Sequence, residues 1–147
     1  MALISLADQE RLRQSFRDVT RAVRLLFFTQ ALDCETCLQT RQILDELPLL
    51  SDNITIEEVN FVLDRDRAKQ YAVERVPAIA VAYEDSSGAV QDSRIRFLGA
   101  PAGYEFISLV EAILLVGGRA SSLSAGNRAR VEAVGHPLTI QVFTTPT

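Results

Sequence analysis

Two cysteines three residues apart carry the most definite chemistry in this chain. Cys34 and Cys37, separated by Glu35 and Thr36, are the only two cysteines among 147 residues, and they follow the apolar run at residues 23–28. Thiols at this spacing can close a disulfide with each other. At the start of a helix, unpaired backbone N–H groups and the helix dipole stabilise a thiolate. Strand, short turn, cysteine pair and helix together indicate a redox site.

Two other interpretations of the cysteine pair stay open. A zinc site needs two further ligands, and only His136 and carboxylates are available to supply them. His136 precedes Pro137 in an expected linker, where an exposed loop histidine is the simpler interpretation. A pair that is oxidised and reduced without catalysing anything is the second alternative. We expect neither a metal ion nor another cofactor.

The elements around the pair should orient the two thiols differently. Residues 35–47 have helical character, and Pro48 ends the segment. Cys37 and Leu44 share one face of that helix, so we expect Cys37 to point inward and Cys34 to point toward solvent.

The rest of the chain alternates between strands and helices. Ser5 should cap a first helix, with Leu12, Phe16 and Val19 supplying its apolar stripe. Further strands are expected at residues 54–62, 78–83 and 94–98, helices at 64–73 and 104–116, and a turn at 86–88. This order predicts an α/β fold in which two βαβ crossovers make a parallel pair and a hairpin adds an antiparallel strand.

Composition restricts the classes of function. Hydrophobic residues make up 48%, charged residues 23%, and the net charge is −4, which suits one globular domain and argues against a general nucleic-acid binder. Five arginines in the N-terminal segment fit a solvated helix face better than a docking surface: Arg11, Arg13, Arg17, Arg21 and Arg24. With neither a membrane-length apolar run nor a secretory signal, we expect a cytoplasmic protein without membrane contact. In that reducing compartment a cysteine pair is more often catalytic or metal-binding than structural.

Three motifs carry a resemblance to known proteins. They are Asp33-Cys34-Glu35-Thr36-Cys37, then Val76-Pro77-Ala78-Ile79, then Phe97-Leu98-Gly99-Ala100-Pro101-Ala102-Gly103-Tyr104-Glu105-Phe106. The chain resembles thioredoxin-fold proteins, and more narrowly the N-terminal unit of two-unit, glutaredoxin-like protein disulfide oxidoreductases. It is also similar to the N-terminal domain of the alkyl hydroperoxide reductase flavoprotein. The resemblance implies a thioredoxin-like fold whose four-stranded mixed sheet is flanked by helices, here with an extra N-terminal helix.

The resemblance also implies roles for individual residues. Cys34 would be the attacking thiol and Cys37 the resolving thiol, and Pro77 would be a cis-proline facing their disulfide. The backbone of Val76 would pair with an extended substrate segment, and Gly99 would allow close approach beside the same groove.

The surroundings of the pair depart from thioredoxin itself. There is no tryptophan before the pair, and Phe28 stands where thioredoxins bury a carboxylate. Asp33 and Glu35 place negative charge beside the first thiol, and Glu35-Thr36 replaces the usual Gly-Pro spacer. We therefore expect a less acidic thiol and a more reducing, sluggish site.

Two functions follow. The first is a dithiol–disulfide oxidoreductase that acts on protein disulfides, contributes to cell redox homeostasis and accepts electrons from a thioredoxin-reductase-like donor. The second is a catalytically weak thioredoxin-like half that binds substrate or supports a more active unit or redox partner, such as a flavoprotein peroxide-reducing system.

The end of the chain predicts a second unit. Residues 138–147 repeat the character of residues 24–29, the segment that leads into the cysteine pair. We therefore expect a thioredoxin-like domain at 1–118, a linker helix within 119–137 capped by Ser124, and the first strand of a truncated second unit at 138–147. The last segment should be poorly ordered or pair with a neighbour.

Overall fold

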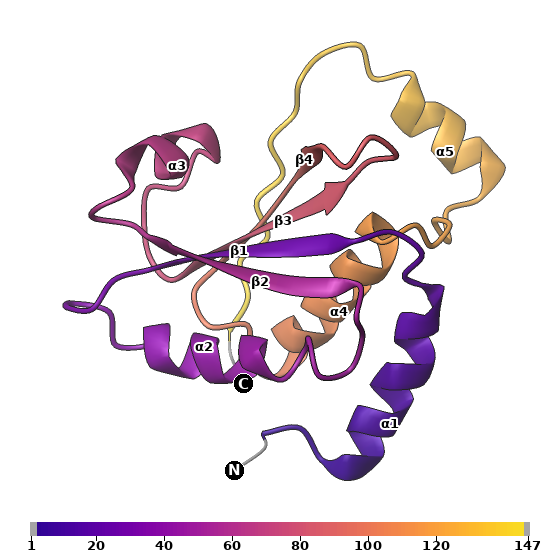
Figure 1. Cartoon of the computed structure of the whole chain (residues 1–147). Helices are drawn as coiled ribbons and strands as arrows, with labels where there is room; N and C mark the ends of the chain where they lie inside the picture. The colour runs from indigo at the N-terminus through magenta and orange to yellow at the C-terminus, as the bar shows by residue number, and fades with distance from the viewer. Residues whose placement is uncertain (1–2, 146–147) are drawn as a thin grey trace.

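The computed structural model, which describes residues 3–145, has a four-stranded mixed sheet with helices on both faces (Figure 1). Its strands are β1 (Val23–Thr29), β2 (Ile54–Asn60), β3 (Ala78–Glu84) and β4 (Val90–Leu98). Its helices are α1 (Leu6–Ser15), a 3₁₀ turn (Phe16–Asp18), α2 (Cys37–Asp45), α3 (Arg65–Gln70), α4 (Tyr104–Val116) and α5 (Ala125–Glu132). The predicted thioredoxin-like fold with an extra N-terminal helix is confirmed.

The strand order is β2-β1-β3-β4. β1 is parallel to β2 and antiparallel to β3, and β3 is antiparallel to β4. The expectation of a second βαβ crossover is therefore wrong. The helix α3 has six residues and spans about 9 Å, less than the about 23 Å of a seven-residue strand, so it does not by itself carry the chain back along the sheet. The chain thus re-enters the sheet at the end where it left, and β3 runs in the opposite direction.

Alternate residues of β1 supply two cores. Leu25 and Phe27 belong to the larger core, with the apolar faces of α2 and α4, while Leu26 and Phe28 belong to a smaller core under α3. Figure 1 shows α2 and α4 on one side of the sheet and α3 on the other. All four side chains are buried, so β1 has no solvent-facing side over this stretch. The strand that leads into the cysteine pair is therefore enclosed on both faces of the sheet.

The start of α2 differs from the prediction. The helix covers Cys37–Asp45, not residues 35–47. Glu35 and Thr36 form a turn in which the Cys37 N–H donates to the Cys34 carbonyl at 3.5 Å. Consequently Cys37, and not Cys34, is the first helical residue.

Two arginines of the N-terminal segment are structural. Arg21 donates from Nε to the carbonyl of Val116 at 2.6 Å, which caps the last turn of α4, and its guanidinium lies 3.9 Å from the centre of the Tyr83 ring. Arg24 on β1 forms ion pairs with Glu84 of β3 at 2.7 Å and with Glu57 of β2 at 3.2 Å. The hydrogen bond that Arg24 donates to Glu84 raises the pKa of Arg24, and burial opposes this rise without cancelling it. The expectation of a solvated helix face is wrong for Arg24, which is half-buried on a strand, while Arg21 is exposed but lies outside a helix.

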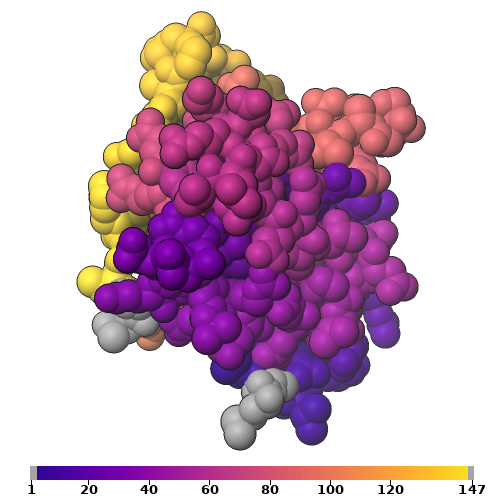
Figure 2. Space-filling model, turned by 60° about the vertical axis from the view of Figure 1, so that its left-hand side comes forward, coloured from indigo at the N-terminus to yellow at the C-terminus, as the bar shows by residue number. Residues whose placement is uncertain are grey.

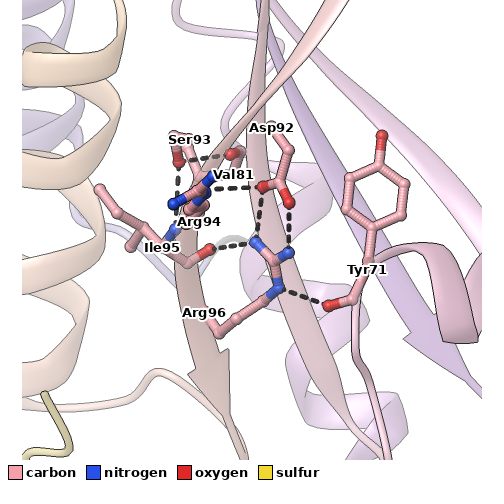
Figure 3. Close-up of polar contacts among 7 residues, drawn as sticks. All are labelled: Tyr71, Val81, Asp92, Ser93, Arg94, Ile95 and Arg96. Carbon is pink, nitrogen blue, oxygen red and sulfur yellow. Dashed lines mark hydrogen bonds and ion pairs between the residues drawn. The ribbon is translucent and has the colours of Figure 1, made fainter. Parts of the chain in front are cut away.

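An irregular stretch interrupts β4 (Figure 3). The register with β3 shifts after Val81, whose carbonyl accepts from the Ser93 hydroxyl at 2.5 Å, and Arg94 has a φ of 65°. Two nitrogens of Arg96 donate to the two oxygens of Asp92. Its Nε donates to the carbonyl of Tyr71, the residue that follows α3. Burial raises the pKa of Asp92, but the Arg96 bonds outweigh it and the net shift is downward. Because the bulge breaks the two-residue alternation, the sequence predicted only the last part of this strand.

The chain after α4 is exposed. Ser124 caps α5, since its hydroxyl accepts from the Asn127 N–H at 3.2 Å, as predicted. Residues 138–145 form no strand with the rest of the described chain, and residues 146 and 147 of the predicted second unit lie outside the described residues. The three-part domain division stays a prediction. No helix within residues 3–145 is long and apolar enough to cross a membrane.

Candidate active site

Cys34 and Cys37 are joined by a disulfide, with their Cα atoms 5.5 Å apart. The pair lies past the carboxyl end of β1, the edge where open α/β sheets place their sites. Cys37 is only 6% exposed and packs in the larger core, whereas Cys34 is half-buried at its edge. The prediction that Cys37 points inward and Cys34 outward is confirmed. Reagents in solution can therefore reach the first sulfur more easily than the second.

The loop before α2 presents Cys34 at the surface. Asp33 has a φ of 55°, a left-handed conformation that aspartate tolerates better than most residues. The side chains of Asp33, Glu35 and Thr36 are exposed, so solvent weakens, without removing, the repulsion between the two carboxylates and a Cys34 thiolate. Figure 2 shows this loop (violet) and the segment around α3 (magenta) on one face of the molecule.

A buried threonine holds the first turn of α2. The Thr40 hydroxyl donates to the carbonyl of Thr36 at 2.8 Å, and the Thr40 N–H donates to the same carbonyl at 2.9 Å. Thr40 is fully buried. Its two bonds join the spacer of the cysteine pair to the body of the helix, which positions Cys37.

The structure brings the other predicted site residues together at the same edge of the sheet. The Val76–Pro77 peptide bond is cis, and Ala78, which follows, pairs with Phe28 at the end of β1. The carbonyl of Pro77 accepts from the Gly99 N–H at 2.9 Å. Val76 is half-buried and Pro77 buried, so the backbone of this step borders the surface.

The stretch that follows Gly99 leads into α4. Gly103 precedes the helix with a φ of 58°, a conformation that glycine adopts without cost. Burial raises the pKa of Glu105 in the first turn. A largely apolar hollow of about 260 Å³ lies between this stretch, α2 and the N-terminal segment; it is lined by Leu3, Ile4, Gln39, Ile43, Pro101, Ala102, Gly103 and Phe106.

A second hollow, of about 300 Å³, includes the disulfide itself and is more polar. Its lining is Thr29, Gln30, Ala31, Cys34, Cys37, Leu38, Arg41, Glu58 and Asn60. Arg41 of α2 forms an ion pair with Glu58 of β2, and its guanidinium lies 5.9 Å from the centre of the Phe27 ring. Of this lining, only the cysteines were predicted as site residues.

Two signals could have drawn attention to the polar hollow. Arg41 lies four residues after Cys37, hence on the same helix face one turn later, and Glu58 is a carboxylate within a strand rich in β-branched residues. What the sequence does not reveal is that these two residues meet. Among residues 3–145, no three side chains of histidine, cysteine, aspartate or glutamate are grouped so that they could hold a metal ion.

Comparison with solved structures supports the fold assignment. The NTD_N/C domain of alkylhydroperoxide reductase AhpF from Enterococcus faecalis (V583) is similar at 27% identity with a TM-score of 0.77, over 87% of this chain and 59% of that one. A protein disulfide oxidoreductase from Aeropyrum pernix shares the fold, with 23% identity, a TM-score of 0.73 and coverage of 88% of this chain and 55% of that one.

Sequence comparison identifies relatives that include an alkyl hydroperoxide reductase protein and thioredoxins. An alkyl hydroperoxide reductase protein of Xanthomonas campestris pv. phaseoli is 39% identical over 83 residues, which are 56% of this chain and 13% of that protein. The chain thus spans a small part of this relative. A "Probable Thioredoxin" of Methanothermobacter thermautotrophicus is 32% identical over 81 residues, 54% of this chain and 80% of that protein. No family model matches. The similarity over most of a thioredoxin's length, on the same fold and with a Cys-x-x-Cys disulfide, shows that this chain belongs to the thioredoxin family.

Proposed function

We propose that this chain is a dithiol–disulfide oxidoreductase that acts on disulfides of other proteins. The observation that carries the proposal is the Cys34–Cys37 disulfide at the carboxyl end of β1, with one sulfur accessible and the other in the core. A donor thiolate can reduce a surface disulfide of this kind, and the resulting dithiol can then attack a substrate disulfide, without unfolding of the domain.

The different burial of the two sulfurs supports an order of steps. In the reduced protein, the Cys34 thiolate attacks a substrate disulfide, which forms a mixed disulfide and releases one substrate thiol after it takes up a proton. Cys37 then loses its proton and attacks the sulfur of Cys34, which restores the protein disulfide and releases the second substrate thiol. Two electrons pass to the substrate, and a dithiol donor must return them before the next cycle.

The substrate chain is expected to lie against the Val76–Pro77 step. β3 begins at Ala78, so the backbone of Val76 precedes the hydrogen-bonded ladder of the sheet. An extended segment can add main-chain hydrogen bonds there, while Gly99 leaves room beside it because nothing lies within 4 Å of the position of a Cβ. Asp33, Glu35 and Thr36 flank Cys34 and Cys37 in the chain and are proposed to tune the reactivity of Cys34.

A second candidate function follows from the similarity to alkyl hydroperoxide reductase AhpF. In this alternative the unit is a weak catalyst that passes electrons between a flavoprotein reductase and a peroxide-reducing partner, or supports a second thioredoxin-like unit of a longer chain. The exposed negative charges beside Cys34 favour it, because they oppose formation of the thiolate.

Turnover of a protein disulfide separates the two candidates. Insulin reduction should be followed with a thioredoxin-reductase-type donor or a limiting dithiol, for the wild type, Cys34→Ser and Pro77→Ala. The first function predicts turnover that Cys34→Ser abolishes, and a raised KM for insulin in Pro77→Ala with little change toward a small disulfide. If the wild type leaves insulin intact while its disulfide still cycles with the donor, the supporting role holds instead.

A further inference from the structure

The polar hollow reaches the disulfide from the side opposite to Pro77. In the sheet, β1 lies between β2 and β3. Glu58 and Asn60 belong to β2 and line the hollow, whereas Pro77 precedes β3. Since Cys34 and Cys37 follow β1, they can be approached from the β2 side as well as from the β3 side.

The size of the hollow restricts what it can hold. At roughly 30 Å³ for each water molecule, about 300 Å³ holds on the order of ten waters. Pockets for small molecules start near this volume, at about 300 Å³. The hollow is therefore large enough for a small molecule.

The wall of the hollow carries one positive and one negative group side by side. The ion pair joins Nη2 of Arg41 to Oε2 of Glu58, which leaves further N–H donors on the guanidinium and a second oxygen on the carboxylate. The two side chains are 41% and 47% exposed, so a solute can reach both. The guanidinium lies 5.9 Å from the centre of the Phe27 ring, at the outer limit of a cation–π interaction.

Neutral hydrogen-bonding groups complete the lining. Gln30 and Asn60 each offer an amide, and Thr29 offers a hydroxyl. A ligand that matches this set has a carboxylate and an ammonium close together, plus a group that reacts with sulfur. A free α-amino acid disulfide has all three.

We propose that the hollow binds a low-molecular-weight amino-acid disulfide, with cystine as the simplest case, as a second substrate of the same cysteine pair. One half of the ligand places its carboxylate on Arg41 and its ammonium on Glu58, which brings its sulfur to Cys34. This inference rests on the proposed function, because it requires that the Cys34–Cys37 pair exchange with disulfides.

The reaction balances without any further reagent. The Cys34 thiolate attacks a sulfur of cystine, whose S–S bond breaks, and the first cysteine leaves and is protonated. Cys37 attacks the mixed disulfide, which forms the Cys34–Cys37 bond and releases the second cysteine. The protein dithiol loses two electrons and two protons, and cystine gains them as two cysteine thiols.

A series of small disulfides of different charge tests the recognition. The pre-reduced protein is mixed with cystine, cystamine, 3,3′-dithiodipropionate or 2-hydroxyethyl disulfide, and the second-order rate of its oxidation is measured. Each rate is divided by the uncatalysed rate of the same reagent with dithiothreitol, which removes differences in intrinsic reactivity. We expect cystine to exceed the neutral disulfide by about tenfold, which corresponds to about 1.4 kcal/mol.

Charge-removing variants then assign the contacts. Arg41→Gln should lower the normalised rates for cystine and dithiodipropionate but not for cystamine, and Glu58→Gln should lower those for cystine and cystamine but not for dithiodipropionate. Arg67→Gln, which breaks a comparable ion pair with Glu57 near α3, is the matched control and should change none of them. Circular dichroism spectra that match the wild type show that the variants are folded, and unchanged rates with 2-hydroxyethyl disulfide show that their cysteine pair still reacts.

The possible outcomes distinguish this inference from the proposed function. The cystine site is overturned if all four reagents have equal normalised rates, or if the variants lower the rates of all reagents regardless of reagent charge. In both cases the oxidoreductase proposal stands. Absence of reaction with every disulfide, insulin included, overturns the proposed function. Oxidised glutathione, whose α-amino-acid ends lie farther from its sulfurs, should react more slowly than cystine. If it reacts faster and loses rate in the same variants, cystine is the wrong ligand.

Discussion

Helix α2 orients the two sulfurs, and substitution of two leucines on its opposite faces tests that orientation. Leu44 is fully buried, and Leu38, on the same helix, is 67% exposed. Leu44→Ala removes three buried carbon groups, worth about 2.4 kcal/mol of transfer free energy at about 0.8 kcal/mol each. The cavity left behind brings the usual total for such a change to about 2–5 kcal/mol. Leu38→Ala should change the free energy of unfolding by no more than about 0.5 kcal/mol.

Urea denaturation of the oxidised proteins, followed by circular dichroism, measures this difference. For a chain of this length about 1 kcal/mol corresponds to about 2–4 °C in Tm, so Leu44→Ala should melt about 6–12 °C below the wild type for a loss near 3 kcal/mol. The m-value should stay unchanged in both variants, because the same surface is exposed on unfolding. Equal losses in the two variants would show that α2 does not present the Cys37 face to the core.

Three further predictions concern other parts of the chain. The hydroxyl of Ser87, first among several hydrogen-bond donors, lowers the pKa of Asp85 from 3.8 to about 2. The carboxylate therefore stabilises the hairpin above pH 3.8 and ceases to do so as the pH falls toward 2, so Asp85→Asn should flatten the fall in unfolding free energy across that window, measured in urea at successive pH values. Gly118→Ala should lower the Tm by several degrees in a thermal melt, since φ is +113° and the new Cβ would lie 2.7 Å from a threonine hydroxyl; an unchanged Tm contradicts this. In the reduced protein, brief limiting iodoacetamide should label Cys34 before Cys37, as mapped by mass spectrometry, because Cys37 is buried; labelling in the reverse order would exchange their assigned roles.

The sequence predicted elements well where local signals agree. The helix at Tyr104–Val116 was predicted with its observed bounds, because Gly103 precedes a strongly apolar amphipathic segment and Gly117-Gly118 follows it. The cysteine orientation was predicted for a similar reason, since Cys37 and Leu44 share a helix face whatever the exact first residue of the helix is.

The features that the sequence missed depend on tertiary contacts. The bulge in β4 breaks the two-residue alternation of the strand, so the sequence pattern does not indicate its first half. The direction of β3 depends on where the connection that contains α3 returns the chain to the sheet. Arg41 and Glu58 come from different elements and meet only when α2 packs beside β2. A single arginine or glutamate in the sequence does not show whether its side chain lines the active site or is an ordinary surface charge.

The most direct test of the central claim is to trap the mixed disulfide. Cys37→Ser can attack a substrate disulfide but cannot resolve the product, whereas Cys34→Ser lacks the accessible thiol. After pre-reduction and incubation with a disulfide-bonded peptide, intact-mass analysis and peptide mapping should find the peptide attached to Cys34 in Cys37→Ser and almost no adduct in Cys34→Ser. An adduct that forms on Cys37 in Cys34→Ser, with none on Cys34 in the other variant, would contradict the assignment of Cys34 as the attacking thiol.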